Sequence, residues 1–490
     1  MDVIPPSVTR IAVLDRTKEP GSNGEPLYQD VAAAVLQSGR RIDVIGGRYG
    51  LSSKEFNPAM VKAVFDNALS DRPMRRFTVG IDDDVTHLSL PVGEPVHTVP
   101  ADTVQCLFYG MGSDGTVGAC KQAASIIGST EGLYAQAYFH YSAKKSGGYT
   151  KSELRFGHAP VRAAYAIQSA DYVGCNKNTY VNRFRLLDVI RPGGIFVLNS
   201  AWTLDRMEKV FPASLKRAIA TKKVRFYNID AFGIAARTGL GVRINTIMQT
   251  VFFKLTGVIP FDEAIDRFKK LISTTYMHEG GEVVRQNYAA IDATVAALTQ
   301  VDYPASWADA TDAPAAGDSA LLEFVRDIAI PCNRLMGDSI PVSALDPAGI
   351  MPMGTTAYEK RCIAIDVPEW NPDKCIQCTL CSLCCPHAAI RPVLLDDAEV
   401  KGAPAGFSAV PAKAPALKGL SYRIQVYPAD CTGCATCATI CPGHALTMKP
   451  LDTQLGTQSS YLGYCQRHVT PKETAVSRFT VQGSQFRQPL

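Results

Sequence analysis

The chain has 490 residues, of which 46% are hydrophobic and 20% charged, and this balance excludes an intrinsically disordered protein. The length suffices for about three domains. The formal net charge of +4 is too small for a protein that binds nucleic acid through bulk charge. The sequence has no run of 18 uninterrupted apolar residues, so we predict no membrane span, and its first residues do not resemble a secretory signal.

The first 98 residues alternate between strand and helix patterns. Apolar runs predict strands at 10–14, 42–45 and 77–81, and helical spacing predicts helices at 28–36 and 59–69. Such alternation favours a parallel sheet covered by helices. Because the stretch is short for a complete doubly wound domain, we interpret it as part of one.

A second α/β region follows. The predicted strands are 104–109, 134–141, 163–167, 195–199 and 224–228, and the predicted helices are 116–127, 241–257 and 261–273. Residues 304–319 are rich in Ala, Pro and Asp, which predicts a linker. Residues 451–490 are polar with little periodicity, which indicates a tail.

A glycine-rich motif, G-x-G-x-x-G, follows the predicted strand 104–109 and precedes a predicted helix. Its glycines let the backbone approach a phosphate, and the helix N-terminus offers N–H groups to it. A dinucleotide site would have an acidic residue after the next strand, but two lysines stand there. The motif therefore favours a ligand with more phosphate than NAD; the alternative is a tight turn with solvated lysines. The candidate binding residues are Gly110, Gly112, Ser113, Gly115, Thr116, Lys144 and Lys145.

The 15 cysteines are distributed unevenly, and nine of them lie between residues 375 and 441. We interpret the six scattered ones as small buried apolar residues. The dense group indicates metal binding, because disulfide scaffolds have a higher overall cysteine content.

Within this group the pattern C-x2-C-x2-C-x3-C-P occurs twice, at an offset of 56 residues. This is the spacing of bacterial ferredoxins that hold two [4Fe–4S] clusters, in which the fourth cysteine binds the other cluster. We predict one cluster on Cys375, Cys378, Cys381 and Cys441, and another on Cys431, Cys434, Cys437 and Cys385. The alternative is zinc, which prefers sets of four ligands.

Two adjacent clusters transfer single electrons, so this module predicts low-potential electron transfer. We expect Cys384, His140 and His387 to be structural.

Several stretches of the chain resemble the pyruvate:ferredoxin (flavodoxin) oxidoreductase family, a thiamine-dependent group of 2-oxoacid oxidoreductases. They are residues 11–21, 46–51, 112–118, 134–139, 145–148, 358–361 and 367–370, together with the two cysteine runs.

The resemblance implies a multidomain α/β protein with five parts. Residues 1–98 would be a partial transketolase-C-terminal-like domain, and 99–310 a Rossmann-like, gamma-type α/β domain associated with coenzyme A. Residues 311–368 would form a bridging domain or linker, and 369–450 a bacterial-type 2[4Fe–4S] ferredoxin-like α+β domain. Residues 451–490 would be a tail leading to a thiamine-diphosphate domain.

The implied reaction is oxidative decarboxylation of pyruvate with coenzyme A to acetyl-CoA, which reduces ferredoxin or flavodoxin. This chain would carry two [4Fe–4S] clusters and part of the coenzyme A site. It would carry no catalytic residue, because thiamine diphosphate, Mg²⁺ and a third [4Fe–4S] cluster belong to other domains of the family. We therefore interpret it as a fragment or a split-gene subunit that is inactive alone. The alternative is a non-catalytic iron–sulfur electron-transfer subunit.

The resemblance also implies a homo-oligomeric full enzyme that acts in the cytoplasm, or in a hydrogenosome-like organelle of an anaerobic eukaryote. Neither nucleic acid nor a membrane span is expected.

Overall fold

The structure is a computed structural model, and it describes residues 1, 3–51, 54–144, 147–277, 280–312, 323–472, 480–481 and 484–485. The chain divides into two compact units, Met1–Thr355 and Thr356–Leu490. Both units combine helices with sheets, so the fold is mixed α/β.

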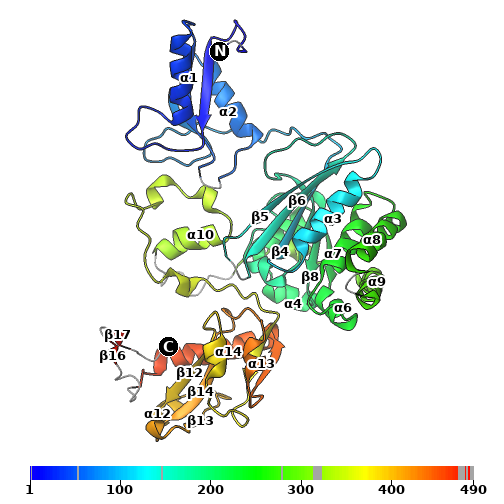
Figure 1. The fold of residues 1–490 in the computed structure, drawn as a ribbon, viewed down its shortest axis with the longest axis vertical. Helices are drawn as coiled ribbons and strands as arrows, with labels where there is room; N and C mark the ends of the chain where they lie inside the picture. Colours follow the sequence, from blue (N-terminus) through cyan, green and yellow to red (C-terminus); the bar gives the residue numbers. More distant parts are fainter. Residues whose placement is uncertain are drawn as a thin grey trace. The chain divides into compact units, whose positions relative to one another are not determined.

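The first unit begins with a small parallel sheet of order β1-β2-β3, formed by Arg10–Asp15, Asp43–Arg48 and Arg76–Thr78. Helices α1 (Pro26–Gln37) and α2 (Pro58–Leu69) connect its strands (Figure 1). Ile45, Val64 and Phe77 are buried together between sheet and helix. The strand–helix alternation predicted for this region is confirmed.

The larger part of the first unit is a seven-stranded sheet of order β10-β9-β8-β7-β4-β6-β5. Its strands are β4 (Val104–Met111), β5 (Tyr134–Tyr141), β6 (Tyr149–Gly157), β7 (Ala170–Cys175), β8 (Ile190–Asn199), β9 (Arg225–Ile229) and β10 (Thr299–Gln300). Strands β4, β7, β8 and β9 are parallel, whereas β6 and β10 run antiparallel to their neighbours.

Helices cover both faces of this sheet (Figure 1). They are α3 (Thr116–Gly128), α4 (Leu204–Val210), α5 (Ala213–Thr221), α6 (Ala231–Arg237), α7 (Asn245–Thr256), α8 (Phe261–Tyr276) and α9 (Gly281–Ala297). Alternate residues of β8 enter different cores, as the two-residue period of a strand requires. Ile195 and Val197 join the core that includes α3 and α7, while Phe196 and Leu198 join the core on the opposite face.

One predicted strand of this sheet is wrong, and two observed strands were missed. Residues 163–167 do not form a strand, although Ala163 and Ile167 are buried. Strands β6 and β7 were not predicted. Strand β6 places Glu153 and Arg155 in the interior, where Glu153 pairs with Lys151 and Arg155 donates to Gln105 and to the backbone of Tyr165. Such internally paired charges hide a buried strand from its hydrophobic pattern.

The predicted linker 304–319 is also partly wrong. Residues Ala305–Asp309 form a 3-10 helix, whose Trp307 is buried beside Phe211 and hydrogen bonded to Glu208. The part of the prediction from residue 313 lies outside the described residues. Further along, Val325–Ala329 and α10 (Ile330–Asn333) form a short helical segment.

Two main strand pairs organise the cysteine-rich part of the second unit. Strand β11 (Asp366–Trp370) pairs with β15 (Leu446–Pro450), and β12 (Ile390–Leu395) pairs with β14 (Ser421–Val426), which also pairs with β13 (Val410–Pro411). Each of the two main pairs joins one strand from each repeat of the cysteine pattern. Short helices α11 (Leu380–Cys384), α12 (Asp397–Lys401) and α13 (Thr436–Ile440) lie between the strands.

Residues that the sequence indicates as the start of a tail form an 18-residue helix, α14 (Leu451–His468). Its buried residues Leu451, Gln458 and Cys465 are seven apart, so the buried stripe is narrow and one member is polar. This explains why no apolar periodicity was visible. Near the chain end, β16 (Thr480–Val481) pairs with β17 (Ser484–Gln485).

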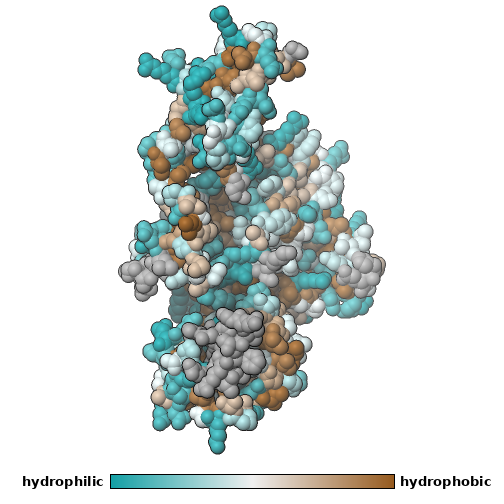
Figure 2. Space-filling model, turned by 60° about the vertical axis from the view of Figure 1, so that its left-hand side comes forward, coloured by the Kyte–Doolittle hydropathy of each residue, from teal (hydrophilic) through white to brown (hydrophobic). Residues whose placement is uncertain are grey.

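On the face shown in Figure 2, hydrophobic side chains form scattered patches among hydrophilic ones. Within the part of the chain that the structure describes, no helix has the length and hydrophobicity needed to cross a membrane.

Candidate functional site

The two cysteine runs fold with matching backbones. Six residues, three in each run and related by the 56-residue offset, have positive φ; they are Gln377, Thr379 and Ala388, and Gly433, Ala435 and His444. Five of the six are not glycine, and such residues rarely adopt this conformation. Two of these positions lie within each C-x2-C-x2-C segment. They curl the loop, so that its three thiols line one cavity.

The fourth cysteine of each run leaves this loop. Helices α11 and α13 end just before it, and Cys385 and Cys441 adopt extended backbone conformations with ψ of 112° and 108°. The proline that follows each of them disfavours continuation of the helix. The C-P ending therefore directs the fourth thiol away from its own loop.

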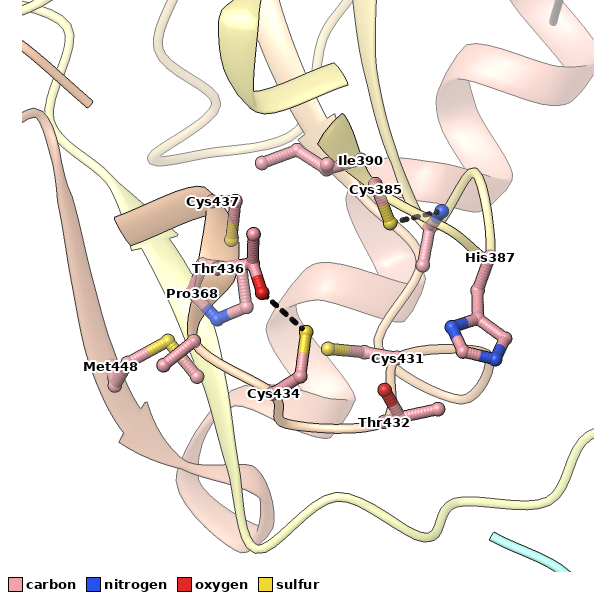
Figure 3. Close-up of a pocket in the computed structure, with 12 residues that line it drawn as sticks. Pro368, Cys385, His387, Ile390, Cys431, Thr432, Cys434, Thr436, Cys437 and Met448 are labelled. Atoms are coloured by element: carbon pink, nitrogen blue, oxygen red, sulfur yellow. Dashed lines mark hydrogen bonds between the residues drawn. The ribbon is translucent and has the colours of Figure 1, made fainter. Parts of the chain in front are cut away.

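Two cavities result, each lined by four cysteines. The first cavity has Cys375, Cys378 and Cys381 from the first run and Cys441 from the second. The second cavity has Cys431, Cys434, Cys437 and Cys385, and their sulfur atoms face one space (Figure 3). The structure thus brings the eight thiols together in the predicted sets, while the binding of iron to them stays a prediction.

Both cavities are otherwise mainly hydrophobic, with Ile424 and Leu446 in the first and Pro368 and Ile390 in the second. Among the described residues, no three His, Cys, Asp or Glu side chains are placed to hold a single metal ion. Four thiols spaced around a hydrophobic cavity are instead a donor set that suits an iron–sulfur cluster.

Several N–H and hydroxyl groups contact the cysteine sulfurs. The backbone N–H groups of Ala389 and Ala445 donate to Cys385 Sγ and Cys441 Sγ, both at 3.3 Å. In the second loop, Gly433 N–H donates to Cys431 Sγ at 3.4 Å. Donors of this kind stabilise the thiolate, which is the form that binds metal.

The thiols differ in acidity. Burial raises the pKa of Cys381 and of Cys437 to about 12. In contrast, the Thr436 hydroxyl, 3.3 Å from Cys434 Sγ (Figure 3), lowers the pKa of Cys434. Since metal ligands must be deprotonated, loading of either cavity would release protons.

Two further side chains lie near the ligand sets. Cys384 lines neither cavity; its thiol donates to the backbone oxygen of Cys381 at 3.4 Å. His387 lines the second cavity. The other histidine considered in the sequence, His140, lies in the first unit and pairs with Glu153 at 3.0 Å.

The glycine-rich loop has the predicted strand–turn–helix setting, between β4 and α3. A Cβ at Gly110 would lie 2.1 Å from Thr116 Oγ1, and Gly115 has a φ of 89°, so both positions need glycine. Thr116 is buried, and its hydroxyl accepts a hydrogen bond from Asn176 Nδ2 at 2.6 Å. Its side chain is therefore engaged inside the protein.

Asp114, which the sequence analysis did not consider, occupies part of the helix N-terminus. Its carboxylate accepts from the N–H groups of Met111 and Thr116, both at 2.8 Å, and burial raises its pKa. The N-cap position itself is Gly115, but an aspartate in a turn commonly accepts from the backbone N–H two residues on, so its place before the helix was a recognisable signal. The N–H groups of Val117 and Gly118 precede the first intrahelical bond, which Ala119 donates to Gly115.

The turn that contains Lys144 lies beside this loop. Gly112 N–H donates to the backbone oxygen of Gly148 at 2.7 Å. Strand β5 reaches the turn from the sheet edge, and β6 separates it from β4, so it is not the adjacent parallel strand of a dinucleotide site. Ser113 is exposed with a φ of 74°, and Lys145 lies outside the described residues.

Comparison with known proteins matches three parts of the chain to family models. Residues 105–297 match a family model described as pyruvate ferredoxin/flavodoxin oxidoreductase, residues 310–364 a domain of unknown function, and residues 367–390 a 4Fe-4S binding domain.

Curated relatives match along the whole chain. The pyruvate:ferredoxin oxidoreductase of Moorella thermoacetica is 52% identical over 492 residues, covering 100% of this chain and 42% of that protein. The pyruvate-flavodoxin oxidoreductase of Enterobacter agglomerans is 46% identical, covering 99% of this chain and 42% of that protein. This chain thus spans about two fifths of the length of these relatives.

Among solved structures, the pyruvate oxidoreductase subunit PORC of Thermotoga maritima aligns with 41% of this chain and 99% of its own, with 18% identity and a TM-score of 0.34.

Proposed function

Because this chain belongs to the pyruvate ferredoxin/flavodoxin oxidoreductase family, we propose that it carries the electron-transfer clusters and part of the coenzyme A site of a pyruvate oxidoreductase. The reaction would join pyruvate and coenzyme A to give acetyl-CoA, carbon dioxide and two electrons. The observation that carries the proposal is the gathering of eight cysteines into two sets of four.

Each cavity would hold one [4Fe–4S] cluster, whose chemistry is one-electron transfer. The chain's own part is to supply four thiolates per cavity, to donate backbone N–H groups to them, and to exclude water with hydrophobic side chains. Ferredoxin or flavodoxin would accept the electrons. The thiamine diphosphate, Mg²⁺ and third cluster that the reaction needs are assigned by the resemblance to domains outside these residues. We therefore propose that residues 1–490 taken alone do not oxidise pyruvate.

The test is metal analysis of the full chain after anaerobic reconstitution. Two complete ligand sets predict about eight iron and eight sulfide per chain. A value near half of this, or stoichiometric zinc that resists replacement, would refute the assignment of two clusters. The matched control is a chain whose thiols are alkylated before reconstitution. Iron that still binds to this chain is not held by cysteines.

For coenzyme A, we propose that the loop formed by residues 110–115, together with Lys144 and Lys145, meets its phosphates. The adjacent loop and turn and the first-turn N–H groups of α3 support this. Asp114 reduces the number of backbone N–H groups that the loop can offer to a phosphate, because its carboxylate already accepts from two of them. The lysines, rather than the loop N–H groups alone, would then supply most of the attraction.

Calorimetric titration can measure that division. Replacing both lysines by alanine is expected to weaken binding of coenzyme A more than binding of the analogue that lacks the ribose 3′-phosphate, because a lysine pairs with phosphate as a point charge. An equal loss for the two ligands would remove the 3′-phosphate role from these lysines.

The alternative, a non-catalytic iron–sulfur subunit, is not favoured, because the match over residues 105–297 is to an oxidoreductase domain rather than to an electron carrier.

A further inference from the structure

Two buried hydrogen-bond donors at the first cavity are unsatisfied among the described residues. Trp370 Nε1 and the Tyr422 hydroxyl are buried, and neither has a hydrogen-bond partner within the described residues. Both residues line the cavity that Cys375, Cys381 and Cys441 also line. Because buried donors in native proteins are nearly always satisfied, a pair of orphaned donors at one cavity indicates an acceptor that belongs there.

Both side chains are held in fixed positions. Trp370 ends strand β11 opposite Leu446, and Tyr422 lies in β14 opposite Leu394. The guanidinium of the buried Arg423 lies 5.9 Å from the centre of the Trp370 ring. Neither donor is on a loop that could swing to another acceptor.

The second cavity has no counterpart of this pair. The 56-residue offset places Val426 at the position of Trp370 and Asp366 at the position of Tyr422, and neither of these residues lines the second cavity. Its own additional residues include Met448 and Thr436, whose hydroxyl is already paired with Cys434. The orphaned donors therefore distinguish the first cavity.

We propose that Trp370 and Tyr422 donate hydrogen bonds to sulfur atoms of the cluster in the first cavity and raise the reduction potential of that cluster. The inference rests on the proposed function, because it requires a cluster in the cavity. Reduction adds negative charge that spreads over the sulfurs, so N–H and O–H donors stabilise the reduced form more than the oxidised form. A phenol remains protonated at neutral pH and can serve as such a donor.

The test uses the full reconstituted chain. Iron content is measured first, and the midpoint potentials of both clusters are then measured by redox titration monitored by electron paramagnetic resonance. Tyr422→Phe keeps the ring and removes only the hydroxyl. We expect it to lower one of the two potentials, with a severalfold fall in the reduced-to-oxidised ratio of that cluster at fixed ambient potential, where tenfold corresponds to about 59 mV. The other potential should not change.

Tyr427→Phe is the matched control, because Tyr427 directly follows β14 but lines neither cavity. This substitution should shift neither potential. Unchanged potentials in Tyr422→Phe, with full iron content, would overturn the role of Tyr422. Fewer than the expected iron atoms in the unmodified chain would overturn the proposed function at the first step, before any potential is measured.

Trp370 can be tested without a substitution. The chain has three tryptophans, and Trp370 is the one in the cysteine-rich unit. Labelling tryptophan with ¹⁵N at the indole nitrogen should produce a ¹⁵N coupling to a reduced cluster in pulsed paramagnetic resonance spectra. No coupling in a chain with both clusters would overturn the role of Trp370.

Discussion

The two repeats of the cysteine pattern, residues 366–395 and 422–451, have one backbone plan but different cavity linings. Their left-handed residues match position by position. Ile424, Ala445 and Leu446 in the first cavity correspond to Pro368, Ala389 and Ile390 in the second. The equivalence ends at the aromatic pair of the first cavity and at His387, Thr436 and Met448 of the second.

The comparison separates two properties of the sites, the ligand geometry and the reduction potential of a bound cluster. The ligand geometry depends on the loop backbone, which both repeats keep. The properties of a bound cluster depend also on burial and on hydrogen bonds to its sulfurs, and those come from side chains that the repeats do not share. Two sites with equal ligands can thus have unequal potentials, and the order of two potentials decides which site holds the electron.

The largest expected effect comes from removing a fourth cysteine, which each run supplies to the cavity of the other run. Cys385→Ser should remove the cluster of the second cavity and lower the iron content from about eight to about four per chain. Combined with Cys431→Ser it should cause no further loss, whereas combined with Cys375→Ser it should remove nearly all iron. Cys384→Ser is the control and should retain full iron, because Cys384 lines neither cavity. Further loss in the first combination would contradict the crossed sets.

A second test exchanges residues between the repeats. Gly443 corresponds to His387, and a Cβ at Gly443 would lie 2.4 Å from the backbone oxygen of Lys374. Gly443→His should therefore destabilise the chain by about 1–3 kcal/mol, because the backbone must move. His387→Gly should cost less. Urea denaturation of both variants measures the difference, and equal costs would show that the close approach at Gly443 is unimportant.

A third test addresses the ion pair between α12, which follows the first repeat, and Lys472, which follows α14. Asp396 and Glu399 form a capping box on α12, and Lys472 Nζ pairs with Glu399 at 2.7 Å. Burial alone would raise the pKa of Glu399, but hydrogen bonds from Lys472 and Thr470 outweigh it and lower that pKa. Lys472→Met should lower the free energy of unfolding by about 1–2 kcal/mol at neutral pH, because Glu399 loses a charged partner.

The pH dependence of that loss has a definite sign. A carboxylate with a lowered pKa contributes stability above its unfolded pKa of about 4.3, and this contribution disappears as the pH falls through the folded value. The unfolding free energies of the original chain and of Lys472→Met should therefore converge in acid. A difference that stays constant through acidic pH would indicate lost packing instead of a lost ion pair.

The smallest effect concerns the hydroxyl at the second cavity. Thr436→Val removes the hydrogen bond to Cys434 Sγ with little change of shape, so it should raise the pKa of Cys434 in the metal-free chain. The potential of the second cluster should shift less than in Tyr422→Phe, because Cys434 is exposed and water can take the place of the lost hydroxyl. Alkylation rates against pH and redox titration measure the two effects. A potential shift larger than that of Tyr422→Phe would contradict the expectation that the buried donors of the first cavity affect their cluster more strongly.

Sequence alone predicts the cysteine sets well because their spacing encodes the loop directly. Cys375 and Cys441 are 66 positions apart, yet the repeated C-P ending was sufficient to place them in one set, and the structure brings them to one cavity. Strand β4 and helix α3 were predicted almost to their ends, since an apolar run followed by glycines is a strong local signal.

The failures arise where side chains satisfy one another over long distances. Strand β6 was missed because Glu153 and Arg155 are buried through partners on other segments. The donor groups of Trp370 and Tyr422, which have no hydrogen-bond acceptor among the described residues, could not be recognised either, since their shared cavity depends on strands β11 and β14. Asp114 was missed although its position was informative, because the glycines around it directed the interpretation to phosphate.

The pairing of β11 with β15 and of β12 with β14 has a consequence for biosynthesis. A ribosome makes the chain from its N-terminus, so the thiols of the second cavity are all present once Cys437 has been added, while the first cavity must wait for Cys441. Neither set can be complete on a nascent chain that ends between the repeats. Iron delivered at that stage would meet three thiols on a loop whose partner strands have not yet been synthesised. With the proposed ligand sets, complete insertion of the clusters would therefore occur only after translation of nearly the whole cysteine-rich region.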